Sequence, residues 1–228
     1  AKVEGSDHLL LATVFDGKDR HQVVTGAPNS REGMITAFAP PGTHLPAVDL
    51  QVERREMAGV TSNGVLLSPR ELGVSDYAGG LIEFGADVEP GADLASLWPG
   101  DDVIELELTP NRADAFSILG VARDVAAKLA SAYRHPASDL DAGDPDIDDG
   151  LQVEVMDEQG SPYFTLRRVD GVTIAPSPVW LQRRLSSMGL RPRNNVVDVT
   201  NLVTFELGQP SHAYDERRLT GGTIQVRR

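Results

Sequence analysis

Short apolar runs, most of them ended by glycine or proline, dominate the first 98 residues of the chain. Runs of this kind are typical of β-strands separated by turns. The first two runs flank Asp16-Gly17, a dipeptide that favours a hairpin turn. The spacing predicts an all-β unit, most simply a small closed barrel. The predicted strands are residues 9–14, 21–25, 34–39, 65–68 and 81–84.

Residues 99–134 change pattern from a strand to a helix. After Pro99-Gly100, residues 103–108 alternate between apolar and acidic side chains, as in a half-buried strand. From Asp114 the apolar residues recur at helical spacing. They are Ile118, Val121, Val125 and Leu129. Asn111, Arg112 and Asp114 lie between the two elements, and we interpret them as a turn and a helix cap rather than a catalytic cluster.

Residues 135–150 contain six aspartates together with proline and glycine. This composition leaves little to bury, so the segment is interpreted as an acidic linker. The order of its carboxylates does not match a calcium-binding loop, which needs glycine and a late glutamate at fixed positions.

A second compact unit is predicted from residue 151 onward. Ser177-Pro178 is a helix start signal, with Ser177 as the cap, and Gly189 is a stop signal. The intervening apolar residues fall on one helix face. The strands predicted around this helix are residues 151–155, 163–167, 171–174 and 223–226.

The stretch from Arg191 to Asp215 combines uncharged polar groups with apolar residues more densely than any other. Asn194 before the apolar run and Gly208 after it favour a helix over 196–207. Alternation and dense β-branched residues would also fit a strand. Under either interpretation Thr200, Asn201 and His212 lie close in the chain, as capping groups or as groups that orient a water or a bound ester.

Composition limits the possible functions. With 228 residues, two domains are expected rather than one. The formal net charge of −13 disfavours broad, non-specific binding of nucleic acid. The absence of cysteine excludes disulfides, thiolate zinc sites and a cysteine nucleophile, and it fits a cytoplasmic protein. No apolar run approaches the length of a membrane span, and no signal peptide is visible.

Several ordered strings resemble one family. NNVVDVTN (194–201), followed by ELGQPSHAYD (206–215), resembles the start of the editing module in the β subunit of bacterial phenylalanyl-tRNA synthetases. ELTPNRADAFSILGVARDVA (107–126) resembles the connector of that subunit. VVTGAPN (23–29) and GVTSNGVLLS (59–68) resemble its tRNA-binding oligonucleotide-binding (OB) fold domain.

The resemblance implies an α+β, multi-domain fold, in which a small OB-type barrel is followed by an incomplete mixed α/β editing module. Its predicted parts are the OB-fold domain (1–98), the connector (99–134), the acidic linker (135–150) and the first part of the editing module (151–228). The chain is thus interpreted as an interior fragment, inactive alone because an acidic residue of the editing pocket would lie beyond Arg228. No ATP or metal site is predicted within it.

By the same resemblance, the partner is an α subunit in an α2β2 enzyme that uses ATP and Mg²⁺ to charge tRNA-Phe in the cytoplasm. The implied chemistry is hydrolysis of tyrosine from mischarged Tyr-tRNA-Phe. Thr200 and Asn201 would hydrogen-bond the ester or the water, and His212 would position the ribose or the water, or act as a general base. The alternative is a non-catalytic module for tRNA docking and assembly, for which the candidate phosphate contacts are Lys18, Arg20, Arg31, Arg183 and Arg184.

Overall fold

The structure is a computed structural model that describes residues 1–135 and 150–228. The chain divides into two compact units. Unit 1 comprises Ala1–Glu107 and Ala175–Leu202, and unit 2 comprises Leu108–Ile174 and Val203–Arg228. The predicted domain boundaries stay predictions. The acidic linker predicted for 135–150 lies, apart from its two end residues, outside the described residues.

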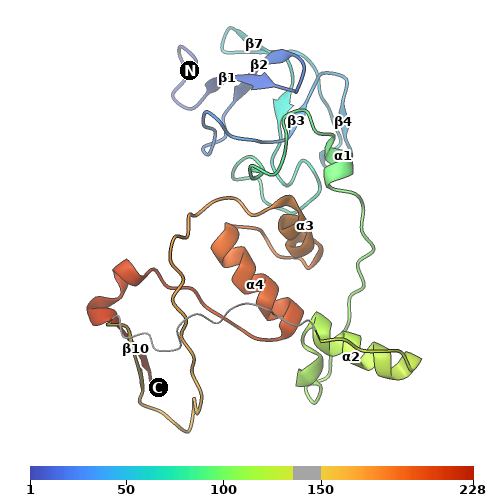
Figure 1. Ribbon diagram of the computed structural model, residues 1–228. Coiled ribbons are helices and arrows are strands. Elements are labelled where there is room, and N and C mark those ends of the chain that lie inside the picture. Colours follow the sequence, from blue (N-terminus) through green and yellow to red (C-terminus); the bar gives the residue numbers. More distant parts are fainter. Residues whose placement is uncertain (136–149) are drawn as a thin grey trace. The chain divides into compact units, whose positions relative to one another are not determined.

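Unit 1 begins with the predicted hairpin. Strands β1 (Leu10–Phe15) and β2 (Arg20–Thr25) lie side by side in Figure 1 and pair antiparallel. Phe15 lies opposite Arg20 in this register. The Asp16 carboxylate accepts hydrogen bonds from the backbone amides of Lys18 at 2.9 Å and Asp19 at 2.7 Å, and so closes the turn. Gly17 adopts a φ of +90°, which glycine reaches without steric cost.

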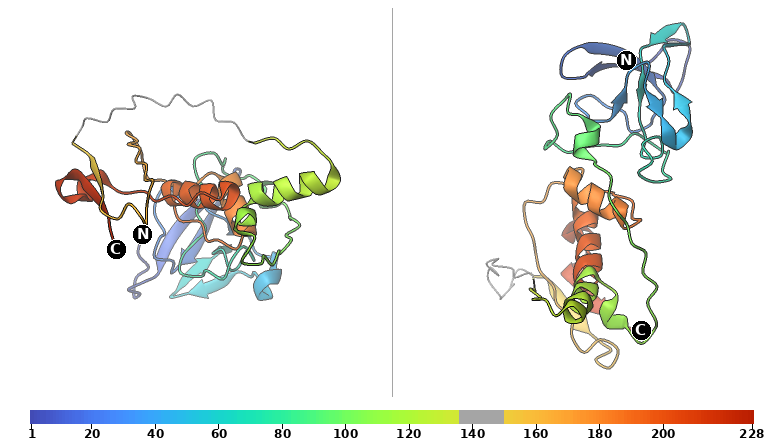
Figure 2. Two further views of the ribbon diagram at one scale, coloured as in Figure 1. Left: turned by 90° about the horizontal axis from the view of Figure 1, so that it is seen from below. Right: turned by 90° about the vertical axis from the view of Figure 1, so that its right-hand side faces the viewer.

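The other strands of unit 1 are only two or three residues long. They pair antiparallel two by two, β3 with β8, β4 with β5 and β6 with β7, and the right-hand view of Figure 2 shows them gathered near the hairpin. Their bounds are β3 (Phe38–Ala39), β4 (His44–Leu45), β5 (Leu50–Gln51), β6 (Arg55–Met57), β7 (Val60–Ser62) and β8 (Val65–Leu66).

The closed barrel is therefore not confirmed, although the mixed α and β content is. Within the described residues the sheets are two-stranded and do not join into a barrel. The run predicted as a strand over 34–39 keeps only Phe38–Ala39 as a strand, while Ile35 forms an isolated bridge with Phe84. Glycine or proline lies on both sides of these runs, as Gly33 and Pro40 do around 34–39, so few successive residues are available for a continuous ladder.

The core of unit 1 consists of two clusters of buried side chains. One surrounds Val23, which is fully buried in β2, together with Leu66 and Leu81. The other contains Val52, Leu67, Ile82 and Phe84 from the strands and loops, and it also contains Val179 from the C-terminal half of the sequence. The apolar side of a helix near residue 180 thus completes the core of the N-terminal strands.

That helix is α3 (Val179–Ser187), and it is followed by α4 (Asn195–Leu207). The helix predicted over 196–207 is confirmed and the strand alternative is wrong. The Asn194 side chain accepts hydrogen bonds from the amides of Val196 and Val197, which stabilises the start of α4. Gly208 follows its last residue with a φ of +77°.

Unit 2 contains α2 (Ile118–Leu129), which begins later than predicted. Ser117 caps it by accepting a hydrogen bond from the amide of Gly120. Strands β9 (Gln152–Val155) and β10 (Thr223–Val226) pair parallel and confirm the first and last strands predicted for this part. Figure 1 labels β10 near the C-terminus. The short helical turns of the chain are α1 (Leu94–Leu97), η1 (Pro46–Val48), η2 (Ala113–Ala115), η3 (Glu216–Arg218) and η4 (Thr220–Gly222).

Four predicted strands are wrong. Residues 103–108, 163–167 and 171–174 have no regular structure, and residues 81–84 form no strand, since only Phe84 pairs there, in its isolated bridge with Ile35. Ile104 is 81% exposed and Leu106 is 53% exposed, so the alternating pattern of this segment does not face a core. In the part of the chain that the structure describes, no neighbouring strand pairs with these segments, and an apolar alternation without a partner makes no ladder.

Candidate functional site

Thr200 and Asn201 lie in the middle of α4, within unit 1. Both are half-buried. The Thr200 hydroxyl donates a hydrogen bond of 2.7 Å to the Val197 carbonyl one turn earlier, so toward a ligand its oxygen can act as an acceptor. An asparagine carboxamide carries two donors and one acceptor, which makes Asn201 suited to contact a carbonyl or a water.

His212 follows α4 in an exposed segment that belongs to unit 2. Its ring meets the ring of Tyr214 edge to face, with the centroids 4.6 Å apart. Just beyond, Asp215 accepts hydrogen bonds from the backbone and the guanidinium of Arg217, which hold the pKa of the carboxyl below its ordinary value. Thr200 and Asn201 belong to one unit and His212 to the other, so a cluster of the three stays a prediction.

Asp198, which sequence reasoning did not single out as functional, is the most tightly held polar side chain of α4. It is fully buried. Its carboxylate accepts a hydrogen bond of 2.5 Å from the Ser177 hydroxyl and one of 2.8 Å from the amide of Arg193. A signal was available, because a charge between valines in an apolar helix needs a buried partner. The Ser177 hydroxyl is thus bonded to Asp198. Its predicted role as the cap of α3 is wrong, since α3 has no side-chain cap.

Unit 1 contains an open groove of about 1060 Å³ between β1 and the segments around residues 30–38 and 88–97. Arg20 and Phe15 lie on its rim, and the guanidinium carbon of Arg20 is 5.6 Å from the centre of the Phe15 ring, a cation–π geometry. Acidic side chains also line the groove, so its charge does not favour phosphate everywhere. They are Asp16, Glu32, Glu89 and Asp93.

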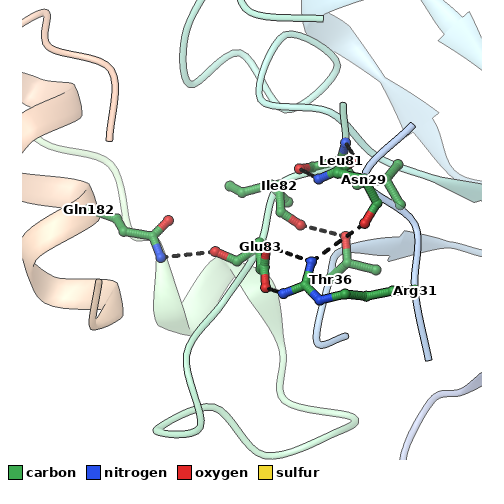
Figure 3. Close-up of polar contacts among 7 residues, drawn as sticks. All are labelled: Asn29, Arg31, Thr36, Leu81, Ile82, Glu83 and Gln182. Carbon is green, nitrogen blue, oxygen red and sulfur yellow. Dashed lines mark hydrogen bonds and ion pairs between the residues drawn. The ribbon is translucent and has the colours of Figure 1, made fainter. Parts of the chain in front are cut away.

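Arg31, another groove residue, already has a partner. Its guanidinium pairs with the Glu83 carboxylate, and the carbonyl of Glu83 accepts a hydrogen bond of 3.0 Å from the side chain of Gln182 (Figure 3). Asn29 binds both the amide and the carbonyl of Leu81, which aligns this segment with the loop that carries Arg31. A phosphate would have to compete with Glu83 for Arg31.

The remaining basic candidates differ in exposure. Lys18 lies exposed at the tip of the hairpin, and Arg184 lies exposed in the last turn of α3. Arg183 is half-buried on the same helix. The five candidates come from the hairpin, the loop after β2 and α3, and their role in RNA binding stays a prediction.

Ionised groups stabilise the turns of both units. In unit 1 the backbone amide of Asp19, with His21 and the amide of Lys18, lowers the pKa of Asp16 from 3.8 to about 2. In unit 2 the guanidinium of Arg112 lowers the pKa of Asp114, and Asp114 with Asp124 raises the pKa of Arg112. Within residues 1–135 and 150–228, no group of three or more histidine, aspartate or glutamate side chains is arranged to hold a metal ion.

Comparison with known families separates the sequence into two recognised parts. Residues 1–93 match the model of the putative tRNA binding domain, and residues 160–228 match the model of the B3/4 domain. The chain therefore combines a tRNA-binding type of domain with a B3/4 domain. In the part of the chain that the structure describes, no helix has both the length and the apolar character needed to cross a membrane.

Two relatives that align with more than nine-tenths of the chain have the same name. The chain is 44% identical over 226 residues to the phenylalanine–tRNA ligase β subunit of Mesorhizobium japonicum, covering 98% of this chain and 28% of that protein. It is 41% identical over 214 residues to that of Bacillus subtilis, covering 91% of this chain and 26% of that protein. The chain belongs to the family of phenylalanine–tRNA ligase β subunits and spans about 28% of the length of the first of these relatives.

Proposed function

We propose that this chain is the part of a phenylalanine–tRNA ligase β subunit that supports the charging of tRNA-Phe and hydrolyses tyrosine from mischarged Tyr-tRNA-Phe. The observation that carries the proposal is the similarity to such β subunits over 98% of the chain, with both a tRNA-binding and a B3/4 domain matched. An OB-type arrangement of residues 1–98 belongs to the same proposal.

The whole ligase would supply what this chain lacks. We assign ATP, Mg²⁺ and the synthesis of the ester to an α subunit, assembled with β as α2β2 in the cytoplasm, as the family resemblance implies. In this proposal the chain alone is inactive or nearly so, because the editing pocket needs further residues.

Editing would be the attack of a water oxygen on the carbonyl carbon of the tyrosyl ester. The bond from that carbon to the ribose oxygen breaks, and the proton lost by the water passes to the ribose oxygen. The ester is already activated, so placing the water and stabilising the oxyanion can be sufficient. Asn201 would donate its amide hydrogens to the oxyanion, the Thr200 oxygen would accept from the water, and His212 would hold the ribose or the water.

The test uses the full-length ligase with Asn201→Ala, and Asn63→Ala as a control that removes a half-buried asparagine elsewhere in unit 1. Deacylation of Tyr-tRNA-Phe should fall tenfold or more, about 1.4 kcal/mol of transition-state stabilisation. Charging of phenylalanine should persist in both variants. If Asn201→Ala deacylates as fast as the control, the editing role of α4 is rejected.

The alternative, a non-catalytic module for tRNA docking and subunit assembly, takes its support from the Arg20–Phe15 pair on the groove. An aromatic ring beside a guanidinium can stack a base and contact a phosphate. The acidic residues of the groove speak against it. The same experiment separates the two functions, since docking alone predicts normal deacylation by the Asn201→Ala ligase.

A further inference from the structure

Asp198 and Asn201 lie on the same side of α4, three residues apart. The rotation of this helix about its axis therefore decides where the Asn201 side chain points. Asp198 is fully buried, so its carboxylate cannot move without leaving its partners. Whatever holds Asp198 also sets the direction of Asn201 and, two residues from Asp198, of Thr200.

The two hydrogen-bond partners of Asp198 hold both oxygens of its carboxylate. Ser177 is itself 2% exposed and donates to the carboxylate across 2.5 Å, while the amide of Arg193 donates to the other oxygen across 2.8 Å. Hydrogen bonds to an ionised group are stronger and shorter than neutral ones. Burying a carboxylate is nevertheless costly, and apolar residues could pack a helix at lower cost, which argues that the group serves to orient α4.

Ser177 is in turn attached, through Gln182, to the irregular segment of unit 1 that carries Glu83. Its carbonyl accepts a hydrogen bond of 2.7 Å from the side chain of Gln182. The same amide group of Gln182 donates to the carbonyl of Glu83 across 3.0 Å, as Figure 3 shows. Gln182 is 4% exposed, so this link is shielded from water.

A second attachment runs parallel to the first. The amide of Val179, the first residue of α3, donates to the carboxylate of Asp87 across 3.2 Å, and the Val179 side chain lies in the main core cluster. Leu181 and Leu185 are almost fully buried on the same helix. Helix α3 is thus packed into the core of unit 1, and Asp198 joins α4 to Ser177, just before α3, and to the amide of Arg193, just after it. Asn195 adds a contact at the start of α4, because its side-chain oxygen accepts from the amide of Ala175 and its own backbone amide donates to the Ala175 carbonyl.

We infer that Asp198, held by Ser177, is a positioning residue that orients Asn201 and Thr200 for hydrolysis of the mischarged ester. The inference rests on the proposed editing function and adds to it. Asp198 is fully buried, so it acts through the direction of α4 rather than at the surface of the site. A displacement of about 1 Å at reacting groups can cost a hundredfold in rate, so a small rotation of α4 is sufficient to slow the reaction.

The main test is Ser177→Ala in the full-length ligase, with Ser62→Ala as the matched control. Ser62 is 3% exposed and makes two hydrogen bonds, from the amide of Val24 and to the carbonyl of Gly64. Both variants should lose some thermal stability. Only Ser177→Ala should lower the kcat of Tyr-tRNA-Phe deacylation, by about tenfold with KM unchanged, while phenylalanine charging is kept.

A double variant separates positioning from general damage. If Ser177 acts through Asn201 and Thr200, then adding Ser177→Ala to the Asn201→Ala ligase slows deacylation by clearly less than the tenfold expected in the native ligase, because only the contribution of Thr200 remains to be lost. Independent, additive losses would overturn the inference. Asp198→Asn is the second single variant: its amide keeps one acceptor but loses the charge, and we expect a threefold to tenfold loss of kcat.

The outcomes also distinguish this inference from the proposed function. If Asn201→Ala slows deacylation and neither Ser177→Ala nor Asp198→Asn does, the positioning role is wrong and the editing function stands. If Asn201→Ala has no effect, the editing function itself fails. If Ser177→Ala and Ser62→Ala slow deacylation equally, the loss reflects stability alone and the positioning role is again rejected.

Discussion

The two units differ in what stabilises them. Unit 1 buries Val23, Val52, Leu181 and Leu185 almost completely. Its main core cluster joins Val52 to Val179, which lies far away in the sequence. In unit 2, whose residues are described apart from 136–149, Ala115 and Ala126 are the buried apolar side chains. Apolar burial is the dominant favourable term in folding, so the resistance of unit 1 to unfolding should come from its core.

Unit 2 instead shows exposed apolar residues and ion pairs on its surface. Val125 and Leu129 of α2 are 49% and 70% exposed. Arg112 pairs with Asp114 and Asp124 across 3.0 and 2.6 Å, in positions open to solvent. Exposed ion pairs contribute little, typically about 0.2–1 kcal/mol each. An amphipathic helix therefore stabilises its unit strongly where other side chains cover its apolar side, as in α3, and weakly where that side is exposed, as in α2.

The largest expected effect is that of Leu185→Ala in α3, because Leu185 is fully buried. Truncating a buried leucine to alanine costs about 2–5 kcal/mol of unfolding free energy. Leu129→Ala in α2 is the matched control, at about 0.5 kcal/mol or less. Urea unfolding followed by circular dichroism detects the helices of both units, so it measures both variants, while tryptophan fluorescence reports on unit 1 alone, where both tryptophans, Trp98 and Trp180, lie. A large loss from Leu129→Ala would mean that the exposed side of α2 is covered in solution, which would break the comparison.

A smaller effect is expected from adding one methyl group at a glycine. In Gly64→Ala the added Cβ would overlap the Ala39 carbonyl and the Phe38 ring, and Gly64 has a φ of +122°. Overpacking of this kind costs about 1–3 kcal/mol, in addition to backbone strain. Gly221 in unit 2 has a φ of +67° and open space around it, so Gly221→Ala should cost only the strain, about 1–2 kcal/mol. Thermal unfolding of the two variants measures the difference in stability. An equal loss of stability would indicate that the backbone of the turn before β8 shifts to accommodate the methyl group.

The smallest effect concerns salt and the two acidic turns. The pKa of Asp16 is lowered mainly by neutral backbone amides, whereas that of Asp114 is lowered mainly by the charged Arg112. Screening by about 1 M salt weakens exposed charge pairs. Carboxyl titrations followed by NMR at low and high salt should therefore show a larger rise for Asp114 than for Asp16. Equal rises would assign the low pKa of Asp16 to His21 instead.

The pH dependence of the hairpin has a definite sign. The folded-state pKa of Asp16 lies below its ordinary value of 3.8, at about 2. Ionised Asp16 therefore stabilises the folded hairpin above pH 3.8, and this contribution is lost as the pH falls from 3.8 toward 2. The Asp16→Asn variant should lack that acid-dependent loss.

Local signals in the sequence were sufficient for the hairpin and for α4. Asp16-Gly17 predicts the turn, and Asn194 and Gly208 predict the ends of the helix, because each acts on backbone groups within a few residues. The prediction of strands at 103–108 and 171–174 is wrong because strand formation depends on residues outside the segment. A strand needs a partner elsewhere, and periodicity alone does not supply one.

Sequence similarity assigns the family, and local signals predict the hairpin, the two helices α3 and α4, and the position of Thr200 and Asn201 within α4. Three contacts follow from tertiary packing instead: Ser177 binds Asp198 rather than capping α3, Arg31 pairs with Glu83, and Val179 completes the core of the N-terminal strands. The physical reason is the distance along the chain over which each interaction acts. Caps and turns are settled between neighbours, whereas a buried charge finds its partner only when distant segments pack together.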